Sequence, residues 1–217
     1  MAPRCKEYLT DDRQDADIIL REEEYLKELW PNWPYDAVCY MESCGIFYSR
    51  LLRFDGMLLH SSAVELDGKA YLFSGPSTVG KSTHARQWQK VFGDAVRVIN
   101  DDKPALRFVD GRWYAYGTPW CGKDGINQNR KVPLGGICFL KQGPKNQIRR
   151  LTSAESVPLI MSQTIYKIKT TETLHYLLET VDKLVRTIPV FELENLPNED
   201  AARLCHAHMA AAAGENE

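Results

Sequence analysis

The hydrophobic positions of this chain follow two periods, one typical of helices and one typical of strands. Apolar residues recur at helical intervals over 35–54, 83–92, 153–163, 172–187 and 198–213. Short apolar runs typical of strands lie at 57–64, 69–74, 95–99, 105–109, 112–116, 134–141, 147–151 and 189–193. Helices and strands mixed in this way along one chain predict an α/β fold with a mixed sheet.

Tight turns between the predicted strands indicate antiparallel pairing. Asp67-Gly68 separates one pair of neighbouring strands, and Asp110-Gly111 separates another. Asp-Gly is a preferred two-residue hairpin turn because both positions accept φ > 0. We further expect 147–151 to pair with 134–141 across the turn at Gly143-Pro144. The sheet is therefore predicted to contain several hairpins rather than only β-α-β units.

Length and composition are those of an ordinary globular chain. The 217 residues are 44% hydrophobic and 26% charged, which suits one buried core. We expect a single domain, with residues 1–55 as a helical and extended N-terminal addition and residues 56–217 as the core. The net charge of −2 gives no argument for a nucleic-acid or membrane partner.

The chain shows no membrane or export signal that we recognise. Its apolar runs are shorter than the roughly 18 residues that a membrane-spanning helix needs, and the N-terminus lacks the apolar stretch of a secretory signal. The six cysteines form no C-x-x-C pair, and Cys138 lies in an apolar run typical of a buried strand. We expect free thiols and a cytoplasmic location.

One motif carries specific chemistry. Residues 75–83 read Gly-Pro-Ser-Thr-Val-Gly-Lys-Ser-Thr, which fits G-x-x-x-x-G-K-[ST] at every fixed position. A predicted strand precedes the motif and a predicted helix follows it, so its backbone N–H groups and the helix N-terminus would face a phosphate. Lys81 would contact the β- and γ-phosphates, and the Ser82 hydroxyl would ligate Mg²⁺. We predict that ATP and Mg²⁺ bind through Gly75, Pro76, Ser77, Thr78, Val79, Gly80, Lys81, Ser82 and Thr83.

Two adjacent carboxylates follow the next predicted strand. Asp101 and Asp102 come after the apolar run 95–99, where a carboxylate that holds Mg²⁺ against a phosphate loop is expected. We assign Asp102 to the metal and Asp101 to the general base that takes a proton from an attacking hydroxyl. The alternative is an ordinary turn, because Asn100-Asp101-Asp102-Lys103-Pro104 is rich in turn-forming residues.

Basic residues concentrate in the loop that follows the second hairpin. Residues 117–133 contain Lys123, Arg130 and Lys131 with few apolar residues. We expect Arg130 or Lys123 to contact the γ-phosphate, as an arginine finger does, and the loop to close when ATP binds. The alternative is a rigid surface loop whose charges face water.

These segments together resemble the family of HPr kinase/phosphorylase and ATP-dependent phosphoenolpyruvate carboxykinase. The resemblance rests on residues 59–64 (Leu-His-Ser-Ser-Ala-Val), on the hairpin that leads into the 75–83 motif and on residues 99–102 (Ile-Asn-Asp-Asp). It covers roughly 57–142 and implies a fold like the C-terminal domain of HPr kinase, a catalytic role for His60 and a homo-oligomer. HPr kinases carry alanine where this chain has Asn100, glycine where it has Ser61, and a glycine-rich loop with a catalytic Glu for which we find no counterpart.

The sequence therefore predicts an ATP-dependent kinase of the HPr kinase type. It would transfer the γ-phosphate of Mg·ATP to a hydroxyl of a small molecule, or to a Ser or Thr of a protein or peptide, whose identity the sequence does not give. The alternative is a regulatory or assembly module that binds ATP without transferring phosphate. A GTPase or a transport ATPase is disfavoured because the chain has no N/T-K-x-D or LSGGQ-like segment.

Overall fold

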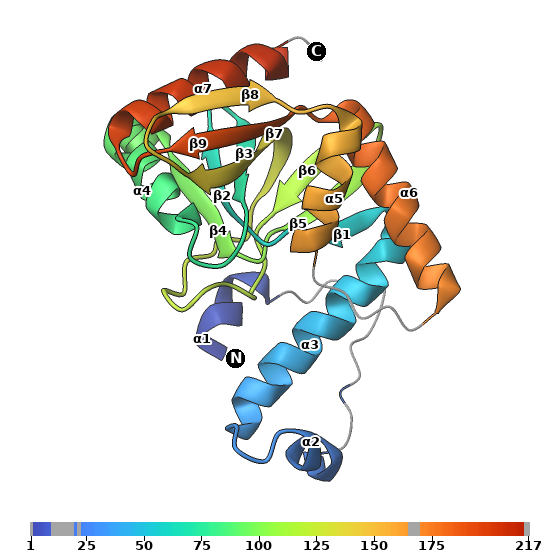
Figure 1. The fold of residues 1–217 in the computed structure, drawn as a ribbon. Helices are drawn as coiled ribbons and strands as arrows, with labels where there is room; N and C mark the ends of the chain where they lie inside the picture. The colour runs from blue at the N-terminus through green and yellow to red at the C-terminus, as the bar shows by residue number, and fades with distance from the viewer. Residues whose placement is uncertain (1, 10–19, 21–22, 165–169, 215–217) are drawn as a thin grey trace.

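The computed structural model describes residues 2–9, 20, 23–164 and 170–214, and Figure 1 shows the course of the chain. The strands are β1 (Gly56–Leu58), β2 (Ser61–Leu66), β3 (Lys69–Ser74), β4 (Arg97–Asp102), β5 (Ala105–Val109), β6 (Arg112–Tyr116), β7 (Lys131–Gln142), β8 (Gln147–Arg150) and β9 (Val190–Asn195). The helices are α1 (Ala2–Cys5), α2 (Glu23–Leu29), α3 (Tyr35–Leu51), α4 (Lys81–Phe92), α5 (Ser153–Gln163), α6 (Thr171–Thr187) and α7 (Glu199–Gly214), with short 3-10 turns at Lys6–Tyr8, Leu52–Phe54 and Gly93–Ala95.

All nine described strands belong to one sheet. The order is β1-β5-β6-β7-β3-β2-β4, with β9 also paired to β7 and β8 paired to β9. The pairs β3–β7 and β7–β9 are parallel, whereas the others are antiparallel. The mixed α/β fold and both Asp-Gly hairpins predicted from the sequence are confirmed.

The sheet is curled. β4 lies at one end of the strand order and β5 lies next to the other end, yet only residues 103 and 104 connect them. The two ends of the sheet must therefore approach each other where β4 passes into β5. This places the end of β4, with its two carboxylates, at the point where the curl closes.

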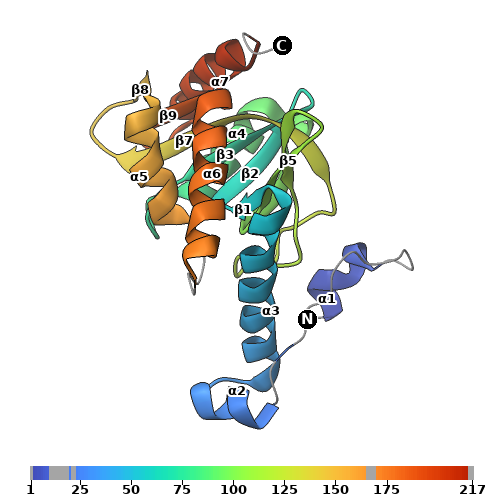
Figure 2. The same cartoon turned by 90° about the vertical axis from the view of Figure 1, so that its right-hand side faces the viewer.

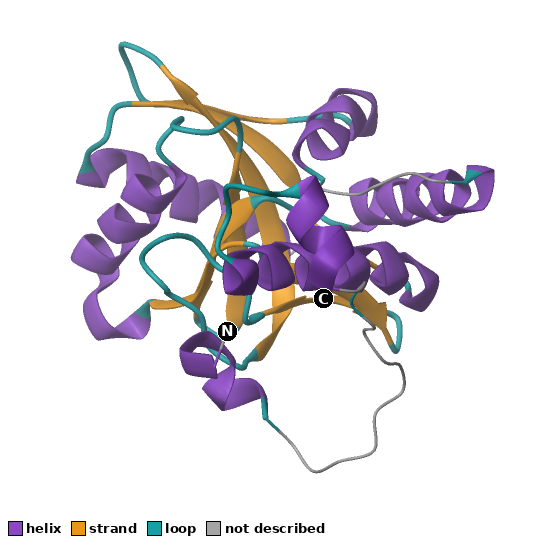
Figure 3. Cartoon of the chain, turned by 90° about the horizontal axis from the view of Figure 1, so that it is seen from below, coloured by secondary structure: helices purple, strands orange, loops and turns teal. Residues whose placement is uncertain are grey.

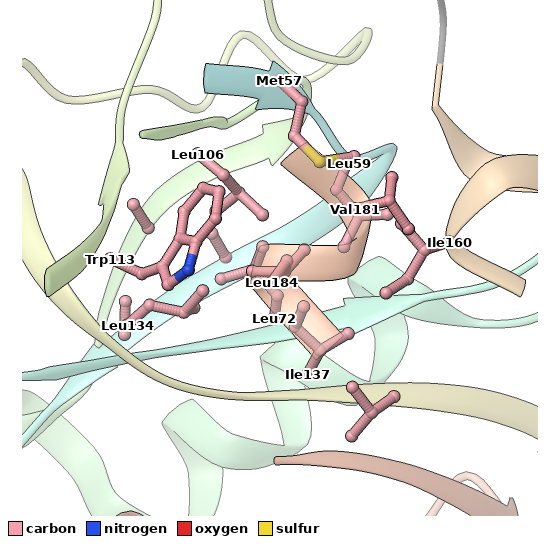
Figure 4. Close-up of a cluster of buried hydrophobic side chains, with 14 of the residues drawn as sticks. Met57, Leu59, Leu72, Leu106, Trp113, Leu134, Ile137, Ile160, Val181 and Leu184 are labelled. Carbon is pink, nitrogen blue, oxygen red and sulfur yellow. The ribbon is translucent and has the colours of Figure 1, made fainter. Parts of the chain in front are cut away.

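Helices cover both faces of the sheet, as Figure 3 shows. Ala70 and Leu72 of β3 belong to the core under α5 and α6, part of which is drawn in Figure 4. Tyr71 and Phe73, which alternate with them, belong to the core under α4 and α7. Side chains of a strand alternate between faces, so a strand buried on both faces is apolar throughout.

Three predicted features of the sheet differ from the structure. The strand expected at 95–99 is β4, which runs to Asp102 and therefore includes both carboxylates. The run 57–64 is not one strand, because β1 pairs with β5 while β2 pairs with β3 and β4. The prediction that 147–151 pairs with 134–141 is wrong, since β9 enters the sheet beside β7 and β8 pairs with β9 instead. The strand at 189–193 was predicted and is present as β9, but local turn signals could not predict its place beside β7, about forty residues later in the chain than β8.

The predicted helices are confirmed within a few residues of their expected limits. The region 1–55 additionally contains α2, which the sequence analysis did not predict. Figure 2 shows α3 projecting from the sheet with α2 at its far end. We call α2, α3 and the turn 30–34 between them the N-terminal arm.

Candidate functional site

The loop between β3 and α4 contains the predicted phosphate-binding motif. Gly75 has φ of 138° and Gly80 has φ of 113°, values that residues with a Cβ rarely adopt. Gly80 is the N-cap of α4 and no side chain caps this helix end. The first N–H groups of an uncapped helix have no intrahelical acceptor, so this helix end fits an anion.

Lys81 is folded back onto this loop. Its Nζ donates to the carbonyl oxygens of Gly75 at 3.0 Å and Pro76 at 3.1 Å. Burial lowers the pKa of the Lys81 ammonium, while Asp102 and Asp101 act in the opposite direction. The ammonium is thus held at the loop close to both carboxylates.

The sheet register places the polar residues of three strands at one edge. Ser61 lies opposite Ser74 of β3 and also opposite Asp102 of β4, because β2 runs antiparallel between them. Ser62 lies opposite Asp101. The end of β3 that leads into the loop and the carboxylates at the end of β4 are therefore neighbours.

Asp101 connects the loop to the sheet. Its Oδ1 accepts a hydrogen bond from the Ser82 hydroxyl at 3.0 Å and a short one from the Ser62 hydroxyl. Asp101 is buried at 8% exposure, and Ser62 is fully buried. The carboxylate is thus fixed against the hydroxyl that the sequence analysis assigned to Mg²⁺.

Asp102 has different partners. Its Oδ1 lies 2.7 Å from His60 Nε2, and its Oδ2 is paired with the Lys103 ammonium. Burial alone would raise the pKa of Asp102, but the hydrogen bonds from His60 and Lys103 lower it to about 2. Its φ of 119° is unusual for a residue with a side chain, and such strain is concentrated at functional sites.

A cleft of about 420 Å³ opens over these groups. It is lined by His60, Ser77, Thr78, Gly80, Lys81, Ser82, Thr83, Asp101, Asp102, Gly122, Lys123 and Asp124. Six of the nine predicted loop residues line it, whereas Gly75, Pro76 and Val79 do not. The same cleft is also lined by His60, Asp101, Asp102 and Lys123. Most of the predicted site residues therefore line one cleft.

Arg130 is not among the residues that line the cleft. Its guanidinium makes a bidentate ion pair with Glu65 of β2, at 2.7 and 2.9 Å. Glu65 lies opposite Arg97 near the start of β4, away from the end that carries Asp101 and Asp102. Of the two cations that the sequence offered for the γ-phosphate, Lys123 is the one at the cleft.

The 117–130 segment is attached to the rest of the protein at several points. Gln128 N–H donates to Ile99 O at 2.9 Å and Asp101 N–H donates to Ile126 O at 3.1 Å, so this segment runs along the edge of β4. The indole N–H of Trp120, which is buried, donates to Tyr40 O of α3. Apart from Asn129, the exposed residues of this segment are those of the tip, 123–126, where Asp124 pairs with Arg86 of α4.

Three residues of the site were missed by sequence reasoning. Ser62 and Lys103 bind the two carboxylates, and the buried Asn100 side chain donates to Thr118 O and Trp120 O and accepts from Lys103 N–H. Ser62 precedes the apolar pair Ala63-Val64 and Asn100 follows the apolar pair Val98-Ile99, and a polar residue at such a place in a strand was the available signal. Their partners could not be deduced without the register of β2 against β4.

Across the part of the chain that the structure describes, no group of three or more His, Cys, Asp or Glu side chains is arranged to hold a metal. None of the described helices is both long enough and apolar enough to cross a bilayer.

Comparisons with known proteins place most of the chain in one family. Residues 30–196 match the family described as SynChlorMet cassette protein ScmC. No curated protein matches the chain. Among solved structures, the chain is similar to the Hpr(Ser) kinase/phosphatase from Coxiella burnetii, with a TM-score of 0.41 and 10% sequence identity over 73% of this chain and 97% of that one.

Proposed function

The chain belongs to the ScmC family, and for this member we propose an ATP-dependent phosphotransferase. It would move the γ-phosphate of Mg·ATP to a hydroxyl of a protein, a peptide or a small molecule. The observation that carries the proposal is the hydrogen bond between Ser82 of the loop and Asp101 of β4, next to the His60–Asp102 pair in one cleft.

The residues present fit a nucleotide. The uncapped start of α4 and the ammonium of Lys81 would bind phosphate oxygens. We assign the metal ligands to Ser82 and Asp101, because these two groups are in contact, whereas Asp102 is turned to His60 and Lys103. This reverses the roles that the sequence suggested for the two carboxylates. When bound, Mg²⁺ would neutralise charge on the phosphates.

Asp102 is then the residue that accepts the proton. As the acceptor oxygen bonds to the γ-phosphorus and the bond from that phosphorus to the β–γ bridging oxygen breaks, the hydroxyl proton passes to the Asp102 carboxylate. Because the pKa of Asp102 is lowered to about 2, this transfer is favourable only late, once the hydroxyl has become acidic by bonding to phosphorus. His60 orients the carboxylate through its Nε2.

Lys123 is the proposed contact for the transferred phosphoryl group. It is exposed at the rim of the cleft, next to Gly122, whose N–H donates to Asp101 O. A cation there would stabilise charge on the equatorial oxygens in the transition state. Arg130 has no part in this proposal because Glu65 holds it elsewhere.

The test is phosphoryl transfer from γ-labelled ATP in a cell extract, with labelled proteins and labelled metabolites separated afterwards. We expect the wild-type chain to label a definite acceptor, and Lys81→Ala and Asp102→Asn to label it at least about tenfold more slowly. Lys90→Ala, an exposed lysine on the same helix as Lys81, is the matched control and should label normally. Binding of Mg·ATP without any labelled acceptor would support the regulatory-module alternative instead.

A further inference from the structure

The tip of the N-terminal arm exposes a group of large apolar side chains. Trp30 is 44% exposed and Trp33 is 54% exposed, and their rings meet edge to face with centroids 5.8 Å apart. Tyr25 and Leu29, one helical turn apart on α2, are also exposed. We call these four residues the aromatic patch.

The patch is not the inner side of the arm. Leu26 of α2 and Val38 of α3 are buried, and the two helices are in contact with each other. Figures 1 and 2 agree that α2 lies at the end of α3 farthest from the sheet. Two exposed tryptophans that pack on each other at the end of a projecting helix are typical of a protein interaction surface.

The charge around the patch restricts what it can bind. Between residues 23 and 36 the chain has four carboxylates, Glu23, Glu24, Glu28 and Asp36, and a single cation, Lys27, which pairs with Glu23 at 2.5 Å. An acidic rim repels the anionic surface of a membrane and attracts cationic side chains. The complementary partner is a segment that combines apolar residues with Lys or Arg.

The arm is also joined to the wall of the cleft. Cys121 N–H donates to the Tyr40 hydroxyl of α3 at 2.7 Å, and the next residue, Gly122, lines the cleft. Tyr40 comes five residues after Tyr35, the first residue of α3, which corresponds to roughly 7.5 Å at a helical rise of about 1.5 Å per residue, and Trp33 lies two residues before this helix begins. A chain docked on the patch would therefore reach the cleft with a short extended segment.

We propose that the aromatic patch docks a basic, amphipathic segment of a protein or peptide whose Ser or Thr is presented to the cleft. That the docked partner is the phosphoryl acceptor rests on the proposed function. If the partner is the acceptor, a free metabolite is not the main acceptor. Docking itself depends only on the arm.

The test measures docking without ATP, by fluorescence anisotropy of a fluorescein-labelled Leu/Lys amphipathic peptide that contains one Ser. We expect saturable binding that weakens about tenfold or more in the double variant Trp30→Ser/Trp33→Ser. The charge reversal Glu24→Lys/Glu28→Lys should weaken it comparably, and added salt should weaken binding to the wild-type chain. A Leu/Glu peptide of the same pattern should not bind.

Leu178→Ser on α6, which removes an apolar side chain that is 47% exposed, is the matched control and should bind the peptide normally. Any one of three results would overturn the inference. The first is equal affinity of the Leu/Lys peptide for all variants, and the second is equal binding of the Leu/Glu peptide. The third is a wild-type dimer that dissociates when Trp30→Ser/Trp33→Ser is introduced. Mg·ATP binding measured on the same variants separates the two proposals. A variant that loses peptide binding but binds Mg·ATP normally shows that docking depends on the arm. A peptide that docks but is not phosphorylated on its Ser counts against the proposed function.

Discussion

Asp101 and Asp102 have different surroundings although they are adjacent in the sequence. Asp101 is turned to Ser62 and Ser82, whereas Asp102, whose φ of 119° departs from strand geometry, is turned to His60 and Lys103. The sequence predicted that both carboxylates belong to the site. It could not predict which faces Ser82, because that depends on how β4 is aligned with β2.

Substituting the two carboxylates separately tests this difference. Asp101→Asn should weaken the dependence of nucleotide binding on Mg²⁺, since the carboxylate that shares the metal with Ser82 loses its charge. Asp102→Asn should leave Mg·ATP affinity nearly unchanged and lower turnover by about 10² or more. Calorimetry and single-turnover transfer measure the two effects. The opposite result, with Asp102→Asn abolishing Mg²⁺ dependence, would restore the roles suggested by the sequence.

His84 should make the fold sensitive to acid. It is buried on α4, where its Nε2 accepts from Trp88 Nε1 and burial lowers its pKa to about 4. A lowered histidine pKa means that the unfolded chain binds a proton below about pH 6.5 that the folded chain does not. The free energy of unfolding should therefore fall between about pH 6.5 and pH 4, by up to about 3 kcal/mol from this group.

Chemical denaturation across this pH range checks the prediction with His84→Gln, which keeps an acceptor for Trp88 but does not titrate. The fall in the free energy of unfolding should be clearly smaller in His84→Gln than in the wild type. His175→Gln, at an exposed site on α6, is the control and should follow the wild type. Parallel curves for wild type and His84→Gln would show that the buried imidazole is not responsible.

At the scale of elements, the segment 117–130 departs most from its sequence-based description. A long loop rich in Gly and Asn predicts mobility, but its polar residues are used for attachment to β4 and α3. Asn100 binds the carbonyls of Thr118 and Trp120, and Trp120 packs against Phe47 and Tyr48 of α3. Only the tip around Lys123 is left to move, so closure on ATP would be a small movement of that tip.

Gly117 is the residue on which this attachment depends most sharply. A Cβ added at Gly117 would lie 1.8 Å from Gln128 O, so Gly117→Ala must displace the segment. We expect amide hydrogen exchange at Gln128 and Asp101 to become at least about tenfold faster. Gly45→Ala, where nothing lies within 4 Å of the added Cβ, is the control. Equal exchange in both variants would mean that the segment is not held by these contacts.

At the scale of the whole molecule, the hairpins and helices could be predicted from local signals, but the order of the strands could not. Asp-Gly turns predicted β2–β3 and β5–β6, and apolar periodicity predicted α4 to α7. The insertion of β9 beside β7 and the separation of β1 from β2 are set by packing between distant segments. The pairing of β2 with both β3 and β4 brings His60, the loop 75–80 and the end of β4 to one edge.

The central claim is that Mg·ATP binds in the cleft between the 75–83 motif and the end of β4. Titration calorimetry of Mg·ATP into the wild type, Lys81→Ala and Lys90→Ala tests it most directly. We predict saturable binding to the wild type and Lys90→Ala, and an affinity at least tenfold lower for Lys81→Ala, a loss of about 1.4 kcal/mol or more. A wild-type chain that gives no saturable signal, or a folded Lys81→Ala variant that binds as tightly as the wild type, would contradict the claim.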